Sequence, residues 1–425
     1  MTFVCIPKHA VGLKEAKTVG EGDKRKKAAE RFDFGFSKFL DMSGEIRLED
    51  VDLEIGNLKI ELPQPTAAVV PQKIVTPPPK KTPWQLSRLS FTPPTIEYPG
   101  QIVEVQLGAT RTHGGTRGKS IVIGGEKCPP FYTLEKPPRH APVVACDIFD
   151  MEIPLPKALK MHIGDAAQDP AAWAKHCVDK FGAEMLTLNL TSTDPSKKNT
   201  SPREAAKTVE QVLQAVDVPL AVGGCGDPGK DLAVFEKVSE TAAGERLLIS
   251  SVSPYMDVEK TAETIKKHGH VALALTGMDI GEARELNRRL YRILPREQII
   301  MDTSTAALGY GLEFTFTVMQ RVRLGALMGD DELQHPMSSG TTNAWFAKEA
   351  WKKMAAKWEP RELRGPMWET ITALTGLLAG VDYFMMMHPA AIKTVKDVIQ
   401  RLMNKEVTMT AELEDPAGWV TLRIK

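Results

Sequence analysis

Polar residues that could hold a ligand stand where short apolar runs end. Asn189 and Asp302 each close such a run, and the string SSGTTN at 338–343 follows another. Amides, hydroxyls and carboxylates at these places are suited to hydrogen-bonding a polar ligand, and no local motif of a nucleophile with its base accompanies them. The alternative for Asn189 and Asp302 is that they only cap loops. The candidate binding residues are Asn189, Thr191, Asp302, Ser338, Thr341, Thr342 and Asn343.

Three further motifs carry weaker signals. The string GGCGDPG at 223–229 resembles a phosphate-cradling loop but lacks GxGxxG spacing, and such loops more often only turn a strand into a helix. A helix is predicted to start near Ala344, so that amide groups of 338–343 either bind an anion or are capped by Thr342 or Asn343. His388 stands alone after an apolar run, which favours a structural histidine over a metal ligand.

The elements that would position these residues follow a regular rhythm from residue 143 onward. Continuous apolar runs are typical of parallel strands buried on both faces, and their alternation with helical patterns indicates βαβ units. Eight units over about 250 residues predict a (β/α)8 TIM barrel, whose loops after the strands share one mouth, with a doubly wound open sheet as the alternative. The runs lie at 143–149, 185–190, 219–222, 247–251, 271–275, 299–301, 334–338 and 383–387.

Helix signals lie between these runs. The string SPRE at 201–204 is a capping box with proline at the first helical position. Asp257 is predicted to cap a helix that ends at Gly269. The stretch 351–358 (WKKMAAKW) has apolar residues spaced as one helix face, which predicts core packing.

The rest of the chain divides by proline density and strand pattern. Residues 44–62 alternate apolar and polar side chains, which predicts a β-containing extension that is a candidate docking segment. The high density of prolines in residues 63–83 predicts an extended Pro-rich linker. The expected units are an extension at 1–62, a linker at 63–100, a hairpin closing the barrel bottom at 101–142, the barrel at 143–403 and a tail at 404–425.

Composition bounds the class of protein. The chain has 425 residues, of which 42% are hydrophobic and 25% charged, and Lys+Arg equals Asp+Glu, so no global basic field favours nucleic acid or a membrane. A signal peptide and a transmembrane run are not expected. Widely spaced cysteines predict reduced, buried thiols in a cytoplasmic protein without its own iron–sulfur cluster. They are Cys5, Cys128, Cys146, Cys177 and Cys225.

Several strings together resemble one protein family. Over about residues 100–403 they are similar to the small, delta-type subunit of the corrinoid iron–sulfur protein in the acetyl-CoA decarbonylase/synthase system, and the N-terminal extension matches more weakly. The strings are RGK at 117–119, IGGE at 123–126, PFY at 130–132, KTVEQVLQAVDVP at 207–219, IMD at 300–302, ALGYGL at 307–312, MGDDEL at 328–333, PMSSGTTNAW at 336–345 and FMMMHP at 384–389.

The resemblance implies a (β/α)8 barrel that forms a heterodimer with a large corrinoid iron–sulfur subunit. That partner would carry the iron–sulfur cluster and hold the cobalamin (corrinoid), which the top of this barrel would cover at the interface. The pair would move a methyl group between a methyl-tetrahydropterin and acetyl-CoA synthase in reversible acetyl-CoA synthesis and cleavage, the Wood–Ljungdahl pathway. Further implied partners are acetyl-CoA synthase and CO dehydrogenase subunits and a pterin methyltransferase.

Two other functions stay open at this point. In one, the barrel is itself a pterin-binding methyltransferase that acts on the corrinoid, since a pterin ring needs amide and carboxylate partners such as Asn189 and Asp302. In the other, the chain is a barrel enzyme of unrelated chemistry. The capping subunit is expected to have no independent turnover, no catalytic residue and no metal site of its own.

Overall fold

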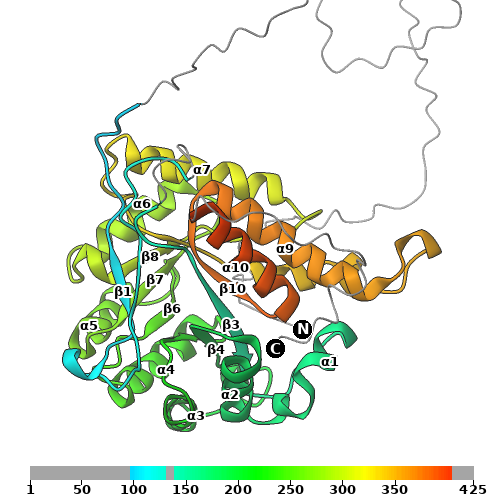
Figure 1. Cartoon of the computed structure of the whole chain (residues 1–425). Helices are drawn as coiled ribbons and strands as arrows, with labels where there is room; N and C mark the ends of the chain where they lie inside the picture. The colour runs from blue at the N-terminus through cyan, green and yellow to red at the C-terminus, as the bar shows by residue number, and fades with distance from the viewer. Residues whose placement is uncertain (1–95, 131–137, 404–425) are drawn as a thin grey trace, which may run out of the picture. The chain divides into compact units, whose positions relative to one another are not determined.

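A closed barrel of parallel strands surrounded by helices forms the body of the protein (Figure 1). The computed structural model describes residues 96–130 and 138–403, so the predictions for 1–95 and 404–425 lie outside the described residues. The strands pair in sequence order, and the last one closes the barrel against the first. They are β3 (Val143–Phe149), β4 (Leu186–Asn189), β5 (Leu220–Gly223), β6 (Leu248–Val252), β7 (Val271–Leu275), β8 (Ile299–Asp302), β9 (Met337–Ser339) and β10 (Val381–Met386). The predicted (β/α)8 fold is confirmed, and the open sheet is wrong.

Helices follow the strands, and the two predicted capping signals are present. Ser201 and Glu204 form the predicted capping box, and the Asp257 side chain accepts from Lys260 N at 3.0 Å. The α-helices are α1 (Lys157–Ile163), α2 (Pro170–Phe181), α3 (Pro202–Ala215), α4 (Pro228–Thr241), α5 (Val258–His268), α6 (Ile280–Leu290), α7 (Leu312–Leu327), α8 (Lys348–Trp351), α9 (Arg361–Ala379) and α10 (Pro389–Met403). The 3-10 helices are η2 (Arg111–His113), η3 (Gly164–Gln168), η4 (Thr191–Thr193), η5 (Arg296–Gln298), η6 (Thr341–Phe346) and η7 (Ala356–Trp358).

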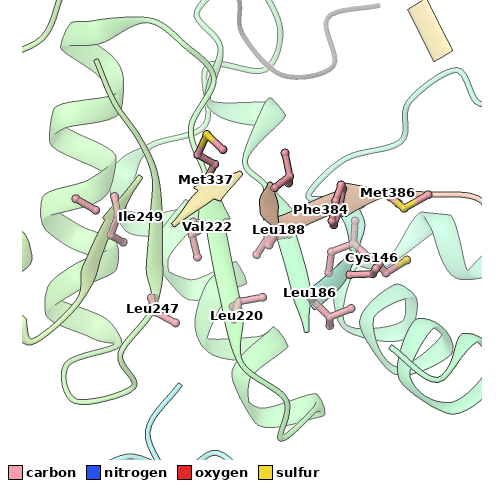
Figure 2. Packing of buried hydrophobic residues seen from close by; sticks show 14 of the residues in the cluster. Cys146, Leu186, Leu188, Leu220, Val222, Leu247, Ile249, Met337, Phe384 and Met386 are labelled. Atoms are coloured by element: carbon pink, nitrogen blue, oxygen red, sulfur yellow. The ribbon is translucent and has the colours of Figure 1, made fainter. Parts of the chain in front are cut away.

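Side chains of each barrel strand alternate between the helix layer and the barrel interior. Leu186 and Leu188 of β4 pack outward in the main hydrophobic cluster, together with Phe384 of β10 (Figure 2). Successive side chains of a strand point to opposite sides. Thr187, which lies between the two leucines, and Asn189, which follows the second one, therefore face the interior. This alternation brings inward-facing residues at the carboxyl ends of the strands to one mouth.

An antiparallel hairpin fills the opposite end of the barrel. Its strands are β1 (Val105–Leu107) and β2 (Ile121–Ile123). Apolar side chains of both strands share a cluster with Val143 and Val271, which begin β3 and β7. Apolar side chains therefore close this end of the barrel.

The stretch 351–358 differs from its sequence prediction. The helix α8 stops at Trp351, which is 41% exposed, and the backbone is extended at Lys352. The buried guanidinium of Arg364 donates to Glu349 O at 2.5 Å and to Lys352 O at 2.7 Å. Those carbonyl groups are the acceptors that a continuing helix would need, so the predicted core helix face is wrong.

Candidate functional site

The carboxyl end of the barrel holds all seven candidate residues. Asn189 and Asp302 are the last residues of β4 and β8, and Ser338 lies within β9. Thr191 begins η4, and the other three candidates begin η6, directly after β9. We call this end of the barrel, with the loops that follow its strands, the mouth.

Asp302 is held by hydrogen bonds from its own neighbourhood. Ser338 Oγ donates to Asp302 Oδ2 at 2.5 Å, and Ser304 N donates to Oδ1 at 2.8 Å. Burial raises the pKa of Asp302 to about 6, although both hydrogen bonds lower it. Because internal donors already engage both carboxylate oxygens, Asp302 is suited to positioning β8 against β9.

A second buried carboxyl, Asp147, lies across the mouth on β3. Thr342 Oγ1 donates to Asp147 Oδ2 at 2.6 Å, while Oδ1 of this residue is buried without a hydrogen-bond partner among the described residues. Burial raises the pKa of Asp147 to about 7. The candidate set omitted Asp147, although an acidic residue inside the apolar run 143–149 is the signal that could have identified it.

Hydroxyl groups link the loop after β8 to η6. Thr305 Oγ1 and Ser339 Oγ are 3.0 Å apart, and Ser339 Oγ lies 3.0 Å from Thr341 Oγ1. Asn343 Nδ2 donates to Thr305 O at 3.0 Å, whereas Asn343 Oδ1 is buried and accepts no hydrogen bond within the described chain. The structure therefore gathers five candidates on β8, β9 and η6 and leaves one buried amide oxygen without a donor among the described residues.

Asn189 and Thr191 lie on another part of the mouth. Asn189 Nδ2 donates weakly to Ile148 O at 3.4 Å, and in the described chain neither residue bonds to the other five candidates. A hollow of about 40 Å³ lies beside Asn189, and Gly223 and Ser250 also line it. This volume is far below the roughly 300–1,000 Å³ of a typical small-molecule pocket.

The backbone amide groups of the glycine-rich loop at 223–229 bind a carboxylate of the chain itself. Asp231 of α4 accepts from Cys225 N at 2.8 Å and from Gly226 N at 2.7 Å. These backbone donors would be needed to cradle a phosphate, and a carboxylate of the chain already occupies them. The loop therefore turns the chain from β5 into α4, which was the commoner reading of its sequence.

The segment after β9 also differs from prediction. No α-helix begins near Ala344; the chain forms η6 instead, and α8, which follows at Lys348, has 4 residues. Asn343 N donates to Gly340 O at 2.9 Å. The predicted α-helix start near Ala344 is thus wrong, because a 3-10 helix of six residues, η6, takes its place.

Glu369 and His388 form a buried polar pair behind the mouth. Glu369 of α9 accepts from Met387 N at 2.6 Å and from His388 N at 3.0 Å, and burial raises the pKa of its carboxyl to about 8. His388 accepts from Ala390 N at 3.1 Å, and burial lowers the pKa of the imidazole to about 3. Sequence reasoning missed Glu369, whose signal was a lone charge in the stretch 365–381.

In residues 96–130 and 138–403, no three or more His, Cys, Asp or Glu side chains gather in a way that could hold a metal ion. The His388 ring is stacked 6.0 Å from the ring of Trp345. Its burial and its backbone hydrogen bond fit the structural role that its sequence position favoured.

Comparison with known proteins identifies the family. A family model described as "CO dehydrogenase/acetyl-CoA synthase delta subunit" matches residues 104–358. This chain belongs to that delta-subunit family. It is 47% identical to the acetyl-CoA decarbonylase/synthase complex subunit delta of Archaeoglobus fulgidus over 85% of this chain and 80% of that protein. Identity to the subunit delta of Methanocaldococcus jannaschii is 43%, over 87% of this chain and 92% of that protein.

Solved structures similar to this delta-family chain include dihydropteroate synthases. The enzyme from Xanthomonas albilineans in complex with 7,8-dihydropteroate aligns with a TM-score of 0.43 and 14% identity, over 65% of this chain and 96% of that one. The enzyme from Thermus thermophilus aligns with a TM-score of 0.41 and 16% identity, over 62% and 94%. In the part of the chain that the structure describes, no helix combines the length and apolarity needed to cross a membrane.

Proposed function

We propose that the mouth of this delta-family subunit covers a corrinoid held by a large corrinoid iron–sulfur subunit. In this proposal the heterodimer supports methyl transfer between a methyl-tetrahydropterin and acetyl-CoA synthase. Membership of a family of complex subunits supports it. The observation that carries it is the composition of the mouth, which has a buried polar floor, an exposed apolar rim and little enclosed volume.

The rim is supplied by loops after three consecutive strands. Tyr255 follows β6, Met278 follows β7 and Tyr310 follows β8, and all three side chains are exposed. A corrinoid combines a broad apolar ring with peripheral amide groups. The rim would pack against the ring, and the partly exposed Asn189, Thr191 and Asn343 would contact its peripheral amide groups, so the residues present fit this group.

The candidate residues divide into two roles in this proposal. Asn189, Thr191 and Asn343 keep 7–8% of their surface exposed and would contact the ligand. The remaining four are 0–4% exposed and would hold the contacting residues in place; they are Asp302, Ser338, Thr341 and Thr342. We assign direct contact to the first three because solvent reaches part of their surface. We assign a supporting role to the other four because almost none of their surface is exposed.

A bound corrinoid would supply a metal centre that accepts and releases the methyl group. The chain's own part would be to exclude water from that centre and to release the covering when the methyl group is passed on. Weak polar contacts suit this role better than a covalent or metal bond to the corrinoid would, because the covering has to be released. The iron–sulfur cluster would lie in the large subunit, and acetyl-CoA synthase, CO dehydrogenase and a pterin methyltransferase would be further partners. The extension at 1–62 is proposed as a docking segment.

The alternative is that the barrel binds the methyl-pterin itself. Asn189 beside the hollow and the buried carboxyls of Asp147 and Asp302 are the kinds of partner that a pterin ring needs. The hollow of about 40 Å³ has no room for a two-ring ligand, so this function would require the mouth to open. Titration of the isolated chain with methyl-tetrahydropterin by calorimetry discriminates the two: binding favours the methyltransferase.

The capping proposal is tested by anaerobic reconstitution with the large subunit, reading corrinoid absorption and methyl transfer. Asn343→Ala removes one proposed polar contact of the mouth, so corrinoid retention is expected to fall about tenfold. The matched control is Gln211→Ala, an exposed amide on α3 far from the strand ends. Retention and transfer that stay unchanged in Asn343→Ala, Asn189→Ala and Thr191→Ala would contradict the proposal.

A further inference from the structure

Two cysteines lie in contact where the first barrel strand, β3, meets helix α2. Cys146 belongs to β3 and Cys177 to α2, and the Cys146 thiol donates to Cys177 Sγ at 3.1 Å. Both are free cysteines, and their exposed fractions are 1% and 0%. They are 31 positions apart in the chain, so the fold and not a local motif brings the two sulfurs together.

The packing around this pair keeps the two sulfurs next to each other. Cys146 belongs to the apolar cluster between the strands and the helix layer (Figure 2). On α2, Trp173 and Cys177 are four residues apart and therefore share one helix face. The Trp173 ring lies 5.7 Å from the ring of Phe149 of β3, measured between centroids. Helix α2 therefore contacts β3 at two points, and the thiol pair is one of them.

We propose that Cys146 and Cys177 form a redox pair, which hydrogen peroxide converts into a disulfide that locks α2 to β3. A buried cysteine that only fills space behaves as a small apolar side chain. Two sulfurs in contact are in addition placed for a bond between them. A disulfide holds its sulfurs at about 2.05 Å, so the present distance of 3.1 Å would shorten by about 1 Å. The proposal does not depend on the function proposed for the mouth.

The conversion consumes one molecule of hydrogen peroxide and releases two molecules of water. The peroxide transfers one oxygen to the first sulfur, which becomes a sulfenic acid, and one molecule of water leaves. The second sulfur then displaces that oxygen, which takes the proton of the second thiol and leaves as water. A small dithiol reverses the reaction by exchange: it becomes a disulfide itself, and its two protons return to the cysteines.

The protonation state of the pair makes this a slow reaction. The hydrogen bond to Cys177, together with burial, raises the pKa of Cys146 well above its usual range. The thiolate is the reactive form of a cysteine, so a protonated and buried Cys146 reacts slowly with an oxidant. The lock is therefore expected to respond to sustained oxidation of the chain.

The disulfide would act directly beside the mouth. Asp147 follows Cys146 in β3 and accepts from Thr342 Oγ1 of η6 at 2.6 Å. A bond that closes a loop across 31 positions restricts the unfolded chain, and it opposes the separation of α2 from β3. Oxidation is therefore expected to raise the melting temperature by about 5 °C and to slow amide hydrogen exchange in both elements.

Peptide mapping without reduction tests whether this bond forms. The folded full chain is treated with hydrogen peroxide, the remaining thiols are alkylated, and the chain is cleaved with trypsin, which cuts after lysine and arginine. A disulfide between Cys146 and Cys177 joins the peptides 140–157 and 176–180, and we expect this linked pair to be the main disulfide product. Alkylation of both cysteines after the peroxide treatment, or disulfides only to other cysteines, would overturn the proposal.

Melting temperatures measure the lock itself. The peroxide-treated chain is compared before and after addition of dithiothreitol, which reduces a disulfide and leaves oxidised methionines as they are. The wild type is expected to lose the gain of about 5 °C on reduction, whereas Cys177→Ala should show no change. The matched control is Cys225→Ala, which removes a buried cysteine outside the pair and should behave as the wild type. Equal behaviour of Cys177→Ala and the wild type would overturn the proposal.

Discussion

Buried carboxyl groups are the unusual residues of the mouth. Burial raises the pKa of Asp302 to about 6, of Asp147 to about 7 and of Glu369 to about 8. Such groups cost stability when they ionise, unless donors surround them. Each accepts hydrogen bonds from nearby hydroxyl or backbone groups, and Asp147 receives the fewest, because its Oδ1 has no partner among the described residues.

The free energy of unfolding is predicted to depend on pH through Asp147. Its pKa is raised from 3.8 to about 7, so between these values the folded protein binds more protons than the unfolded chain, and stability falls as the pH rises. One such proton changes stability by at most about 1.4 kcal/mol per pH unit. Asp147→Asn is therefore expected to flatten the decline, as measured by urea unfolding across this range.

A matched control separates this effect from general surface charge. Glu263→Gln removes an exposed carboxyl on α5 and should leave the slope of stability against pH as in the wild type. The attribution to Asp147 fails if Asp147→Asn has the same slope as the wild type while the protein remains folded.

At the scale of elements, Arg323 joins three parts of the barrel. From α7 it donates to Asp382 Oδ2 of β10 at 2.6 Å and to Glu126 Oε2, just after β2, at 3.1 Å. All three side chains are buried. Asp382 Oδ2 also accepts from Met337 N of β9 at 2.8 Å. This cluster fixes the hairpin and the last two strands to one helix.

Replacing Arg323 with methionine is predicted to destabilise the protein by about 3–5 kcal/mol, since two carboxyl groups would stay buried without their cation. Arg321→Met, two residues earlier on the same helix, is the control because Arg321 is exposed. Thermal and urea unfolding of both variants measure the difference. Adding Glu126→Gln and Asp382→Asn to Arg323→Met should recover part of the loss. Equal stability of the Arg323→Met and Arg321→Met variants would show that the cluster contributes little.

At the scale of the whole molecule, the two ends of the barrel have opposite characters. The mouth is formed by loops after the strands, and the other end is packed by apolar side chains of the β1–β2 hairpin. Changes at well-separated sites act nearly independently. A substitution at the mouth is therefore expected to leave the packed end of the barrel unchanged.

Asn189→Ala tests this independence, because Asn189 ends β4 and the hairpin packs against the other end of the barrel. The variant is predicted to lower corrinoid retention, yet to co-purify with the complex within about twofold of wild type. Quantitative co-purification and corrinoid absorption on the same preparation make the comparison. Loss of the subunit from the complex in Asn189→Ala would show that this residue also supports assembly of the subunit.

The sequence by itself determined the elements and their order. Apolar runs and capping residues such as Ser201 and Asp257 act within a few residues, so their signals are local and readable. The alternation of strands with helices was then compatible with only two architectures, a (β/α)8 barrel and a doubly wound open sheet. The same reasoning placed polar residues at strand ends, where the barrel brings them to one mouth.

Only the tertiary structure decided which polar groups meet and which surfaces stay open. Thr342 and Asp147 are separated by 195 positions in the chain, so no local pattern pairs them. Arg364 ends α8 early because its guanidinium, on α9, reaches carbonyl groups of the segment 349–352. Met367, Ile371 and Leu378 of α9 have the composition of a core helix face, and only the assembled barrel shows that they are exposed. Contacts between distant segments set these features, and a chain's local sequence does not encode them.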